Sequence, residues 1–475
     1  MIEKGKFNSV MARKNEIMKA SIGIDFGEFE SGGISFDYEK MMRKTGYTLA
    51  EMKVIQRHAG VGNTPLLELR NLTSLARMVT NKPGKGARIF VKDEASNPSG
   101  SFKDRRAANA VYHAKRLGYA GVVAATSGNY GAAVASQAAI NGLKCIIVQE
   151  CYDRDGIGQP EIIEKARRCE AYGAEVLQLS VGPELFLTFL NVLEETGYFN
   201  ASLYSPFGIA GVETLGVEIA QQMQELTGNF PDMVVCTHAG GGNLTGTARG
   251  LRKAGAVDTQ VVGASVNLKG LHMASDHQFN RKSFTTGHTG FGIPFATKPD
   301  RSDVPRSAAR VLRYMDRYVT VNQGEVFYAT EALSRLEGLE RGPAGNTSLA
   351  AAFSLAQEMG KDQTLVVQET EYTGAGKHVQ AQLTFAKSRG IDVLFGNPQE
   401  ETVGSSIVLP NHPRQIRAVD INLNRLRQSY IRNALVGRND VELSEVDISF
   451  LVNETQSSEQ FVRNTIADLA AAQHS

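Results

Sequence analysis

The sequence predicts an α/β fold whose core is a parallel sheet, and three observations support this prediction. Short apolar runs rich in β-branched residues recur along the chain. Each run is apolar on both faces, as is typical of strands that helices cover on both sides. Amphipathic segments lie between the runs, and this alternation indicates parallel strands joined by right-handed crossovers. The predicted strands are residues 88–92, 121–125, 145–149, 175–179, 233–237, 261–265 and 365–369.

Amphipathic helices are predicted after several of these strands, over residues 131–140, 161–172 and 213–226. Another helix follows residue 103, with an apolar stripe at helical spacing and charged residues among its other positions. The stripe is Ala107, Ala108, Val111 and Ala114, and the charged residues are Arg105, Arg106 and Lys115. Folds of this class bind ligands at the carboxyl ends of the strands, so each loop after a strand is a candidate site.

The composition is that of a globular protein with two or three domains, because 475 residues at about 150 residues per domain give that number. The 51 basic and 50 acidic residues leave a formal net charge of +1, which gives no overall attraction to nucleic acid or membranes. No apolar run approaches the roughly 18 residues that span a bilayer, and the basic N-terminus lacks the apolar region of a secretory signal. We therefore expect a cytoplasmic protein.

The cysteines predict no disulfide framework and no metal site, since none is in a CxxC pair or at metal-ligand spacing with a histidine. Two fall within predicted strands and are expected in the core, and a third is expected on a helix. Only Cys151, at a strand end, is placed where it could approach a site. The four are Cys145, Cys151, Cys169 and Cys236.

The first chemically suggestive loop, residues 97–105, follows the strand at 88–92 and opens a helix at or near Lys103. The positive end of the helix dipole and partial burial would both lower the pKa of this lysine and leave its amine free to act as a nucleophile. A surface lysine beside Asp104 is the alternative.

The second loop, Thr126-Ser127-Gly128-Asn129-Tyr130-Gly131, joins the strand at 121–125 to an Ala-rich helix. Hydroxyl and N–H groups at a helix start form an anion site suited to a carboxylate. A helix cap formed by Thr126 or Ser127 is the alternative.

The third loop follows the strand at 233–237 and contains Gly240, Gly241, Gly242 and Asn243. Consecutive glycines let the backbone form a concave group of N–H donors that holds a phosphate, and a flexible hinge is the alternative. A nucleophilic lysine, an anion loop and a phosphate loop together predict pyridoxal 5'-phosphate, which carries both an aldehyde and a phosphate.

The same motifs give the chain a resemblance to the fold type II pyridoxal phosphate enzymes, which include threonine synthases, cysteine synthases and serine/threonine dehydratases. The order GNTPL (62–66), NPSGSFKDR (97–105), TSGNYG (126–131), GVETLGVE (211–218) and AGGGNLTG (239–246) resembles theirs, over about residues 61–377. The resemblance implies two three-layer α/β/α domains, like the tryptophan synthase β fold, with the cofactor in the cleft between them. It divides the chain into a large domain (58–110 and 205–396), a small domain (111–204) and extensions at 1–57 and 397–475.

The resemblance also implies the role of each site residue. Lys103 would be the Schiff-base lysine and Asn129 would contact the ring hydroxyl. Gly240, Gly241, Gly242 and Asn243 would hold the phosphate. Thr373, or its neighbour Thr370, would face the pyridine nitrogen. The loop from Thr126 through Ser127 and Gly128 to Asn129 would bind the substrate carboxylate.

The long N-terminal region and the segments PAGNTSLAAAFSLAQEM (343–359) and ETEYTGAGKH (369–378) are distinctive. With them, the chain resembles over nearly its whole length the large subunits of the 2-amino-4-oxopentanoate thiolases of ornithine degradation. The resemblance implies cleavage of 2-amino-4-oxopentanoate by coenzyme A to acetyl-CoA and alanine. It also implies a small α subunit as partner and a homo-oligomer of the large subunit. Threonine synthase-like or cysteine synthase-like replacement or elimination on an amino acid, and a binding subunit without catalysis, remain alternatives.

A stretch of basic residues and one histidine each have both a functional and a structural interpretation. The stretch would suit the phosphates of coenzyme A, or it would be a solvated charged face. His238 directly precedes the glycine loop and could carry a proton or make a structural hydrogen bond. The stretch comprises Arg281, Lys282, Lys298, Arg301, Arg306, Arg310 and Arg313.

Overall fold

The computed structural model describes residues 4–126, 128–202, 204–268, 277–285, 296–298, 304, 306–369, 371, 379–436 and 443–473. Its centre is a seven-stranded sheet of order β1-β2-β10-β7-β8-β9-β13. The five inner strands run parallel, and the edge strands β1 and β13 pair antiparallel. The strands are β1 (Leu66–Glu68), β2 (Arg88–Asp93), β7 (Met233–Thr237), β8 (Gln260–Val266), β9 (Arg317–Val321), β10 (Thr364–Glu369) and β13 (Val419–Asp420).

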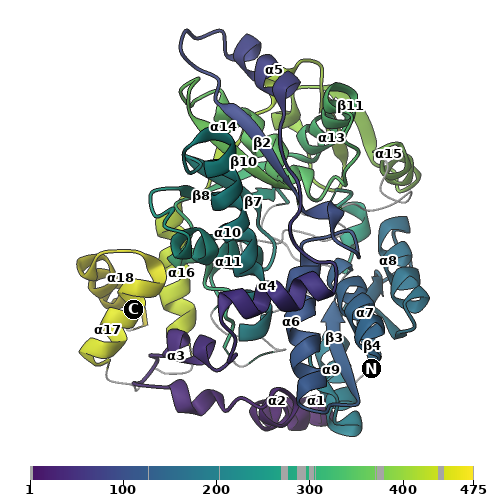
Figure 1. Ribbon diagram of the computed structural model, residues 1–475, viewed down its shortest axis with the longest axis vertical. Coiled ribbons are helices and arrows are strands. Elements are labelled where there is room, and N and C mark those ends of the chain that lie inside the picture. Colours follow the sequence, from purple (N-terminus) through teal and green to yellow (C-terminus); the bar gives the residue numbers. More distant parts are fainter. Residues whose placement is uncertain are drawn as a thin grey trace.

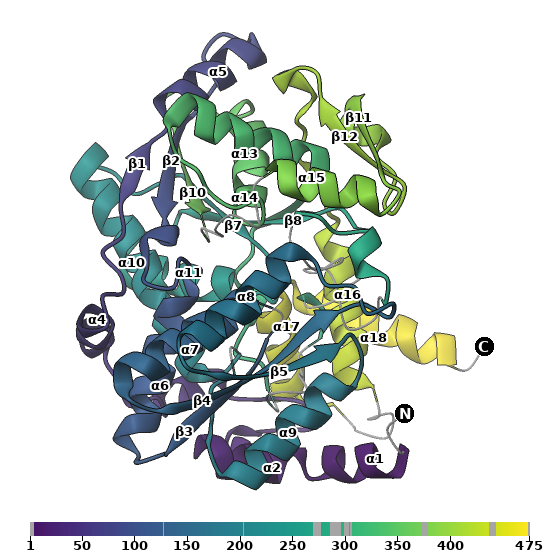
Figure 2. The same ribbon diagram turned by 90° about the vertical axis from the view of Figure 1, so that its right-hand side faces the viewer.

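A second sheet has four parallel strands in the order β5-β4-β3-β6. Figure 2 shows it below the large sheet. All seven predicted strands are confirmed, four in the large sheet and three in this one. The strands are β3 (Gly121–Thr126), β4 (Lys144–Tyr152), β5 (Glu175–Ser180) and β6 (Phe199–Asn200).

Helices cover both faces of the large sheet, because alternate strand residues point into two separate cores. On one face α5 (Arg70–Thr80), α13 (Gln323–Glu337) and α14 (Asn346–Ala356) pack against residues such as Val235. On the other, α10 (Pro206–Thr227) and α11 (Gly242–Lys253) pack against the adjacent Val234. The arrangement is the predicted α/β/α sandwich.

The small sheet is covered in the same way. One face carries α6 (Lys103–Arg116) and α7 (Asn129–Asn141), and the other carries α9 (Glu184–Thr196). The helix α8 (Pro160–Ala171) packs beside α7. The predicted helices at 131–140, 161–172 and 213–226 are confirmed as α7, α8 and α10.

The N-terminal segment wraps around the molecule (Figure 1). Its first helices, α1 (Lys4–Ala12) and α2 (Lys14–Ile22), pack against α9. The segment continues through α3 (Tyr38–Arg43) to α4 (Leu49–His58), which packs against α6 and α10. A capping box between Thr48 and Glu51 fixes the start of α4.

The C-terminal part adds a parallel strand pair and a helical layer. The pair is β11 (Asp392–Gly396) and β12 (Ser406–Pro410), preceded by α15 (Val379–Ser388). The helical layer is α16 (Leu423–Leu435), α17 (Glu445–Thr455) and α18 (Glu459–Gln473). Asp447 joins this layer to the N-terminal segment by accepting hydrogen bonds from the N–H groups of Ile34 (2.9 Å) and Ser35 (3.0 Å).

Candidate functional site

Three of the predicted site segments follow neighbouring parallel strands of the large sheet. The strand β10 lies between β2 and β7 and is parallel to both, so the carboxyl ends of all three strands meet at one edge. The chain after β2 leads to Lys103, and the chain after β7 forms the glycine loop. Thr370 and Thr373 follow β10 and lie outside the described residues.

Lys103 is the first residue of α6 and is half-buried, and its N–H donates to the Ser101 hydroxyl at 3.3 Å. Its neighbour Asp104 is completely buried and accepts a hydrogen bond from the Ser99 N–H at 2.7 Å. Burial raises the pKa of Asp104 to about 7, against the opposing effect of the Ser99 hydrogen bonds. Because Asp104 is buried and Lys103 is half-buried, the two residues do not form the surface pair of the alternative interpretation.

The helical turn that begins with Lys103 packs against the glycine loop. The contact is made by Arg106, three positions along α6. A Cβ atom added to Gly242 would stand only 2.5 Å from Nη2 of Arg106. The structure therefore brings the candidate lysine helix and the candidate phosphate loop together.

The three glycines of the loop are required for different reasons. Gly241 has a φ of +88°, a left-handed conformation that side chains other than glycine rarely adopt. At Gly240 an added Cβ would overlap with the hydroxyl group of Tyr204, and at Gly242 it would press on Arg106. The loop is therefore a tight cradle against neighbouring side chains, and the hinge alternative does not fit it.

The first turn of α11 has the properties expected of a phosphate site. Its N–H groups lack acceptors within the helix, and the helix dipole favours an anion there. Asn243 and Thr245 lie in this turn and are 6% and 0% exposed. Among the described residues, no hydrogen-bond partner is present for Oδ1 of Asn243 or Oγ1 of Thr245. A bound phosphate fits this cradle, because its oxygens accept hydrogen bonds from N–H groups and from a hydroxyl such as that of Thr245.

The loop before α7 is built around the Thr126 hydroxyl, which accepts hydrogen bonds from the N–H groups of Gly128 (2.9 Å) and Gly131 (3.3 Å). Thr126 therefore orders this loop, but it is not the N-cap of α7: that position is Gly128, with no side-chain cap hydrogen bond. Asn129 begins α7 and is buried. A Cβ added to Gly128 would lie 2.5 Å from Cδ of Lys165. Ser127 lies outside the described residues.

A buried cluster of two cations and two carboxylates holds the start of α6. Arg105 pairs with Glu94 (2.7 Å) and with Glu218 (2.8 Å), and Lys92 pairs with Glu218 (3.1 Å). Although burial opposes ionisation of Glu218, Arg105 and Lys92 lower its pKa to about 2. Arg105 lies outside the apolar stripe of the predicted helix, and it is nevertheless completely buried.

The glycines of the GVETLGVE motif allow α10 to pack closely against its neighbours on both sides. A Cβ on Gly211 would overlap with the Arg105 carbonyl, and one on Gly216 would overlap with the Thr247 carbonyl. Between these contacts, Glu213 accepts a 2.6 Å hydrogen bond from Arg249 of α11. Sequence reasoning did not assign these roles to α10, although paired glycines and carboxylates inside an apolar helix were the available signal.

His238 and the four cysteines are buried. The His238 ring packs edge-on against Tyr318, and the backbone N–H of His238 donates to the Ala264 carbonyl at 2.8 Å. All four cysteines are buried and free. Burial raises the pKa of Cys151, Cys169 and Cys236 to about 12, and that of Cys145 further. These thiols stay protonated at neutral pH, so none is a candidate nucleophile.

The positive stretch is partly internal. Arg306 is 6% exposed and lies over the Phe36 ring at 5.4 Å. Arg310 forms ion pairs with Glu454 and, at 3.0 Å, with Glu39. For Arg306 and Arg310 the prediction of a solvated charged face is wrong, because they hold the N- and C-terminal segments in place. Arg281 and Lys298 are exposed, and Arg301 lies outside the described residues.

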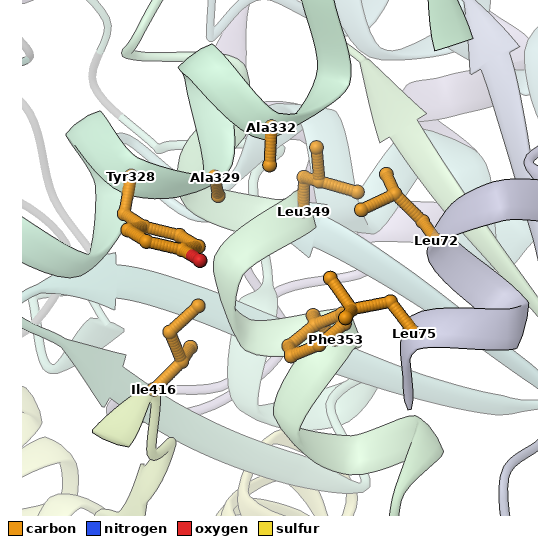
Figure 3. A pocket seen from close by; sticks show the side chains of 8 residues that line it. All are labelled: Leu72, Leu75, Tyr328, Ala329, Ala332, Leu349, Phe353 and Ile416. Carbon is orange, nitrogen blue, oxygen red and sulfur yellow. The ribbon is translucent and has the colours of Figure 1, made fainter. Parts of the chain in front are cut away.

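A small apolar pocket lies away from this site, between α5, α13 and α14 (Figure 3). Leu72, Leu349 and Phe353 are among its lining residues, and the Tyr328 hydroxyl is its one polar side-chain atom. Within the described ranges no cluster of three His, Cys, Asp or Glu side chains could hold a metal ion. No helix of that part of the chain is both long and apolar enough to cross a bilayer.

Comparison with known proteins identifies the family. Residues 58–371 match the family described as "Pyridoxal-phosphate dependent enzyme". The chain is 72% identical to the 2-amino-4-ketopentanoate thiolase beta subunit of Acetoanaerobium sticklandii, over 98% of both chains. It is 63% identical to another such subunit, from an unknown prokaryotic organism, over 99% of both chains. The solved structure of a threonine deaminase from T.th. superposes with a TM-score of 0.52 at 26% identity, over 69% of this chain and 99% of the deaminase. The chain therefore belongs to the pyridoxal-phosphate-dependent enzymes of fold type II, in the family that its thiolase beta-subunit relatives represent, and its cofactor is pyridoxal 5'-phosphate.

Proposed function

We propose that this chain catalyses the thiolytic cleavage of 2-amino-4-oxopentanoate by coenzyme A, giving acetyl-CoA and alanine, as a step of ornithine degradation. The observation that carries the proposal is the contact between the Lys103 turn of α6 and the glycine loop, on a chain whose full length matches thiolase beta subunits. Bound pyridoxal 5'-phosphate supplies an aldehyde for the substrate amine and an electron sink for charge that develops on carbon.

The protein residues bind and orient the reactants around that cofactor. Lys103 holds the cofactor through its amine and, once released, moves a proton at the substrate Cα. Gly240, Gly241, Gly242 and Asn243 bind the phosphate, and Asn129 and Thr373 orient the ring. The loop Thr126-Ser127-Gly128-Asn129 binds the substrate carboxylate. A buried charge cluster fixes the start of α6, where Lys103 lies. Its members are Lys92, Glu94, Arg105 and Glu218.

The overall reaction balances without an oxidant or reductant. The thiolate sulfur of coenzyme A bonds to C4, and the C3–C4 bond breaks with its electron pair remaining on C3. A proton then adds to C3, which becomes the methyl group of alanine. Because coenzyme A is the nucleophile, no cysteine of the protein is needed, in agreement with four buried and protonated thiols.

The same proposal includes the assembly. A small α subunit would be the partner, since the relatives are named beta subunits, and the large subunit would form a homo-oligomer. We also propose the division into a large domain (58–110 and 205–396), a small domain (111–204) and two extensions. It is supported by the two separate sheets, although α6 runs across the boundary at residue 110.

The test is acetyl-CoA formation from 2-amino-4-oxopentanoate and coenzyme A by the complex of this chain with its small subunit. Lys103→Ala serves as the negative control, and O-phosphohomoserine and O-acetylserine are offered in parallel. We expect the wild-type complex to form acetyl-CoA and alanine in equal amounts, and the Lys103→Ala complex to form neither. Turnover of O-phosphohomoserine or O-acetylserine without acetyl-CoA formation would replace the thiolase by a synthase-like enzyme.

A further inference from the structure

Arg106 is a buried cation beside the phosphate loop, and none of the family motifs described above assigns it a role. It is 3% exposed and lies three positions after Lys103 on α6. Its guanidinium stacks over the Phe102 ring at 5.2 Å on one side. The guanidinium also meets Gly242, where an added Cβ would lie 2.5 Å from Nη2 and 3.0 Å from Cζ. The guanidinium therefore touches the first residue of α11.

The loop that Arg106 touches has independent signs of an anion ligand. Oγ1 of Thr245 is buried without a hydrogen-bond partner among the described residues, and this hydroxyl can donate to an anion. Thr245 belongs to the first turn of α11, whose N–H groups and dipole favour an anion. Tyr204 brings its hydroxyl against Gly240 at the other end of the loop. Polar groups thus surround the loop from three elements.

The electrostatics agree with an anion at this position. Burial is the largest influence on Arg106 and lowers its pKa to about 10, while Tyr204 and Tyr130 act in the opposite direction. At neutral pH the guanidinium is still charged, and a buried charge is stabilised when an opposite charge lies next to it.

We propose that Arg106 is a ligand of the cofactor phosphate, adding a positive charge to the N–H groups of the glycine loop. A guanidinium matches the geometry of a phosphate and forms charge-assisted hydrogen bonds with it. This inference concerns cofactor binding alone, so it does not depend on which amino acid the enzyme cleaves.

The test compares binding of pyridoxal 5'-phosphate with binding of pyridoxal, which lacks the phosphate, to the full chain after its cofactor has been removed. The variants are Arg106→Met and Arg106→Lys. The matched control is Lys115→Met, which removes an exposed cation from the same helix. Dissociation constants are measured by fluorescence titration, and circular dichroism checks that each variant is folded.

We expect Arg106→Met to weaken pyridoxal 5'-phosphate binding about ten- to a hundredfold, the effect of losing a hydrogen bond to a charged group. Its affinity for pyridoxal should be unchanged, and Arg106→Lys should lose less affinity for the phosphorylated form. The proposal is overturned if Arg106→Met binds pyridoxal 5'-phosphate like the control, or if both compounds lose affinity equally. If Arg106→Met does not fold, Arg106→Lys decides, since equal losses for the two compounds would again overturn the proposal.

Discussion

Replacing Glu218 by Gln should destabilise the protein because it unbalances a buried charge cluster. The cluster contains Lys92 and Arg105 as cations and Glu94 and Glu218 as carboxylates, and both cations have fully buried side chains. Removing one carboxylate leaves one buried positive charge without compensation. Breaking a buried ion pair in this way typically costs about 3–5 kcal/mol of unfolding free energy.

The pKa of Glu218 gives an independent magnitude. It falls from the ordinary 4.5 to about 2 in the folded protein, and the side chain is only 14% exposed. At about 1.4 kcal/mol per pKa unit this corresponds to about 3 kcal/mol of stability at neutral pH. Because the folded pKa is the lower one, the stabilisation is complete above the ordinary pKa and is lost as the pH falls towards 2. The stabilisation should begin to decrease near pH 4 and should be more than half lost by pH 3.

The assay is urea unfolding followed by circular dichroism at several pH values, with Glu225→Gln as the control. Glu225 lies on the same helix and is exposed. Equal slopes for the two variants allow the difference in midpoint to be converted into a free energy. If Glu218→Gln and Glu225→Gln unfold at the same urea concentration at pH 7, or if their difference does not shrink at low pH, the reasoning is refuted.

Three further predictions concern the glycine loop, the N-terminal segment and the thiols. Gly240→Ala should reduce the ratio of bound cofactor to protein about tenfold or more, and Tyr204→Phe in the same chain should restore part of it by removing the overlapping hydroxyl. Asp447→Asn should lower the thermal midpoint and expose residues 30–37 to proteolysis, as judged by mass spectrometry of the fragments. Although burial opposes ionisation of Asp447, hydrogen bonds from Ile34, Ser35 and Ser444 hold its pKa well below the usual range. The effect should therefore be present at neutral pH and vanish in strong acid, and an equal deficit in acid would contradict it. Iodoacetamide should modify none of the four cysteines of the native protein at pH 7 on the timescale of an activity assay. The reason is that burial keeps the thiols protonated. Rapid loss of activity on alkylation would show that one of them is exposed.

The sheets were predictable from the sequence because a buried strand leaves a local signal. All seven predicted strands are short and apolar, and the structure contains each of them. The strand β9 (RYVTV) was missed because polar residues interrupt its apolar character, although four of its five residues are buried. The strands β1, β6 and β13 have only two or three residues each, too few for any periodicity.

The candidate site was predictable as far as single loops carry its chemistry. Lys103 and the glycine loop could be found because a lysine at a helix start and consecutive glycines are unusual in themselves. Burial of Arg105 and Arg106 could not, since charged residues in an amphipathic helix are normally solvated. Their burial depends on α10 and α11, which follow some hundred residues later in the chain and supply Glu218 and Gly242 as neighbours.

The N-terminal extension pairs with the helix that begins with the glycine loop, and the C-terminal extension is linked to this contact through Arg310. Arg249, in the second half of α11, hydrogen-bonds to Glu213 and to Glu39, both at 2.6 Å. Glu39 belongs to α3 of the N-terminal segment and also pairs with Arg310, which holds Glu454 of α17. Burial opposes ionisation of Glu39, but the two arginines lower its pKa to about 2, so these ion pairs persist at neutral pH. Since a helix moves nearly as a rigid body, fixing the second half of α11 also fixes the direction of its N-terminal N–H groups. We therefore expect the extensions to help fix the position of the glycine loop.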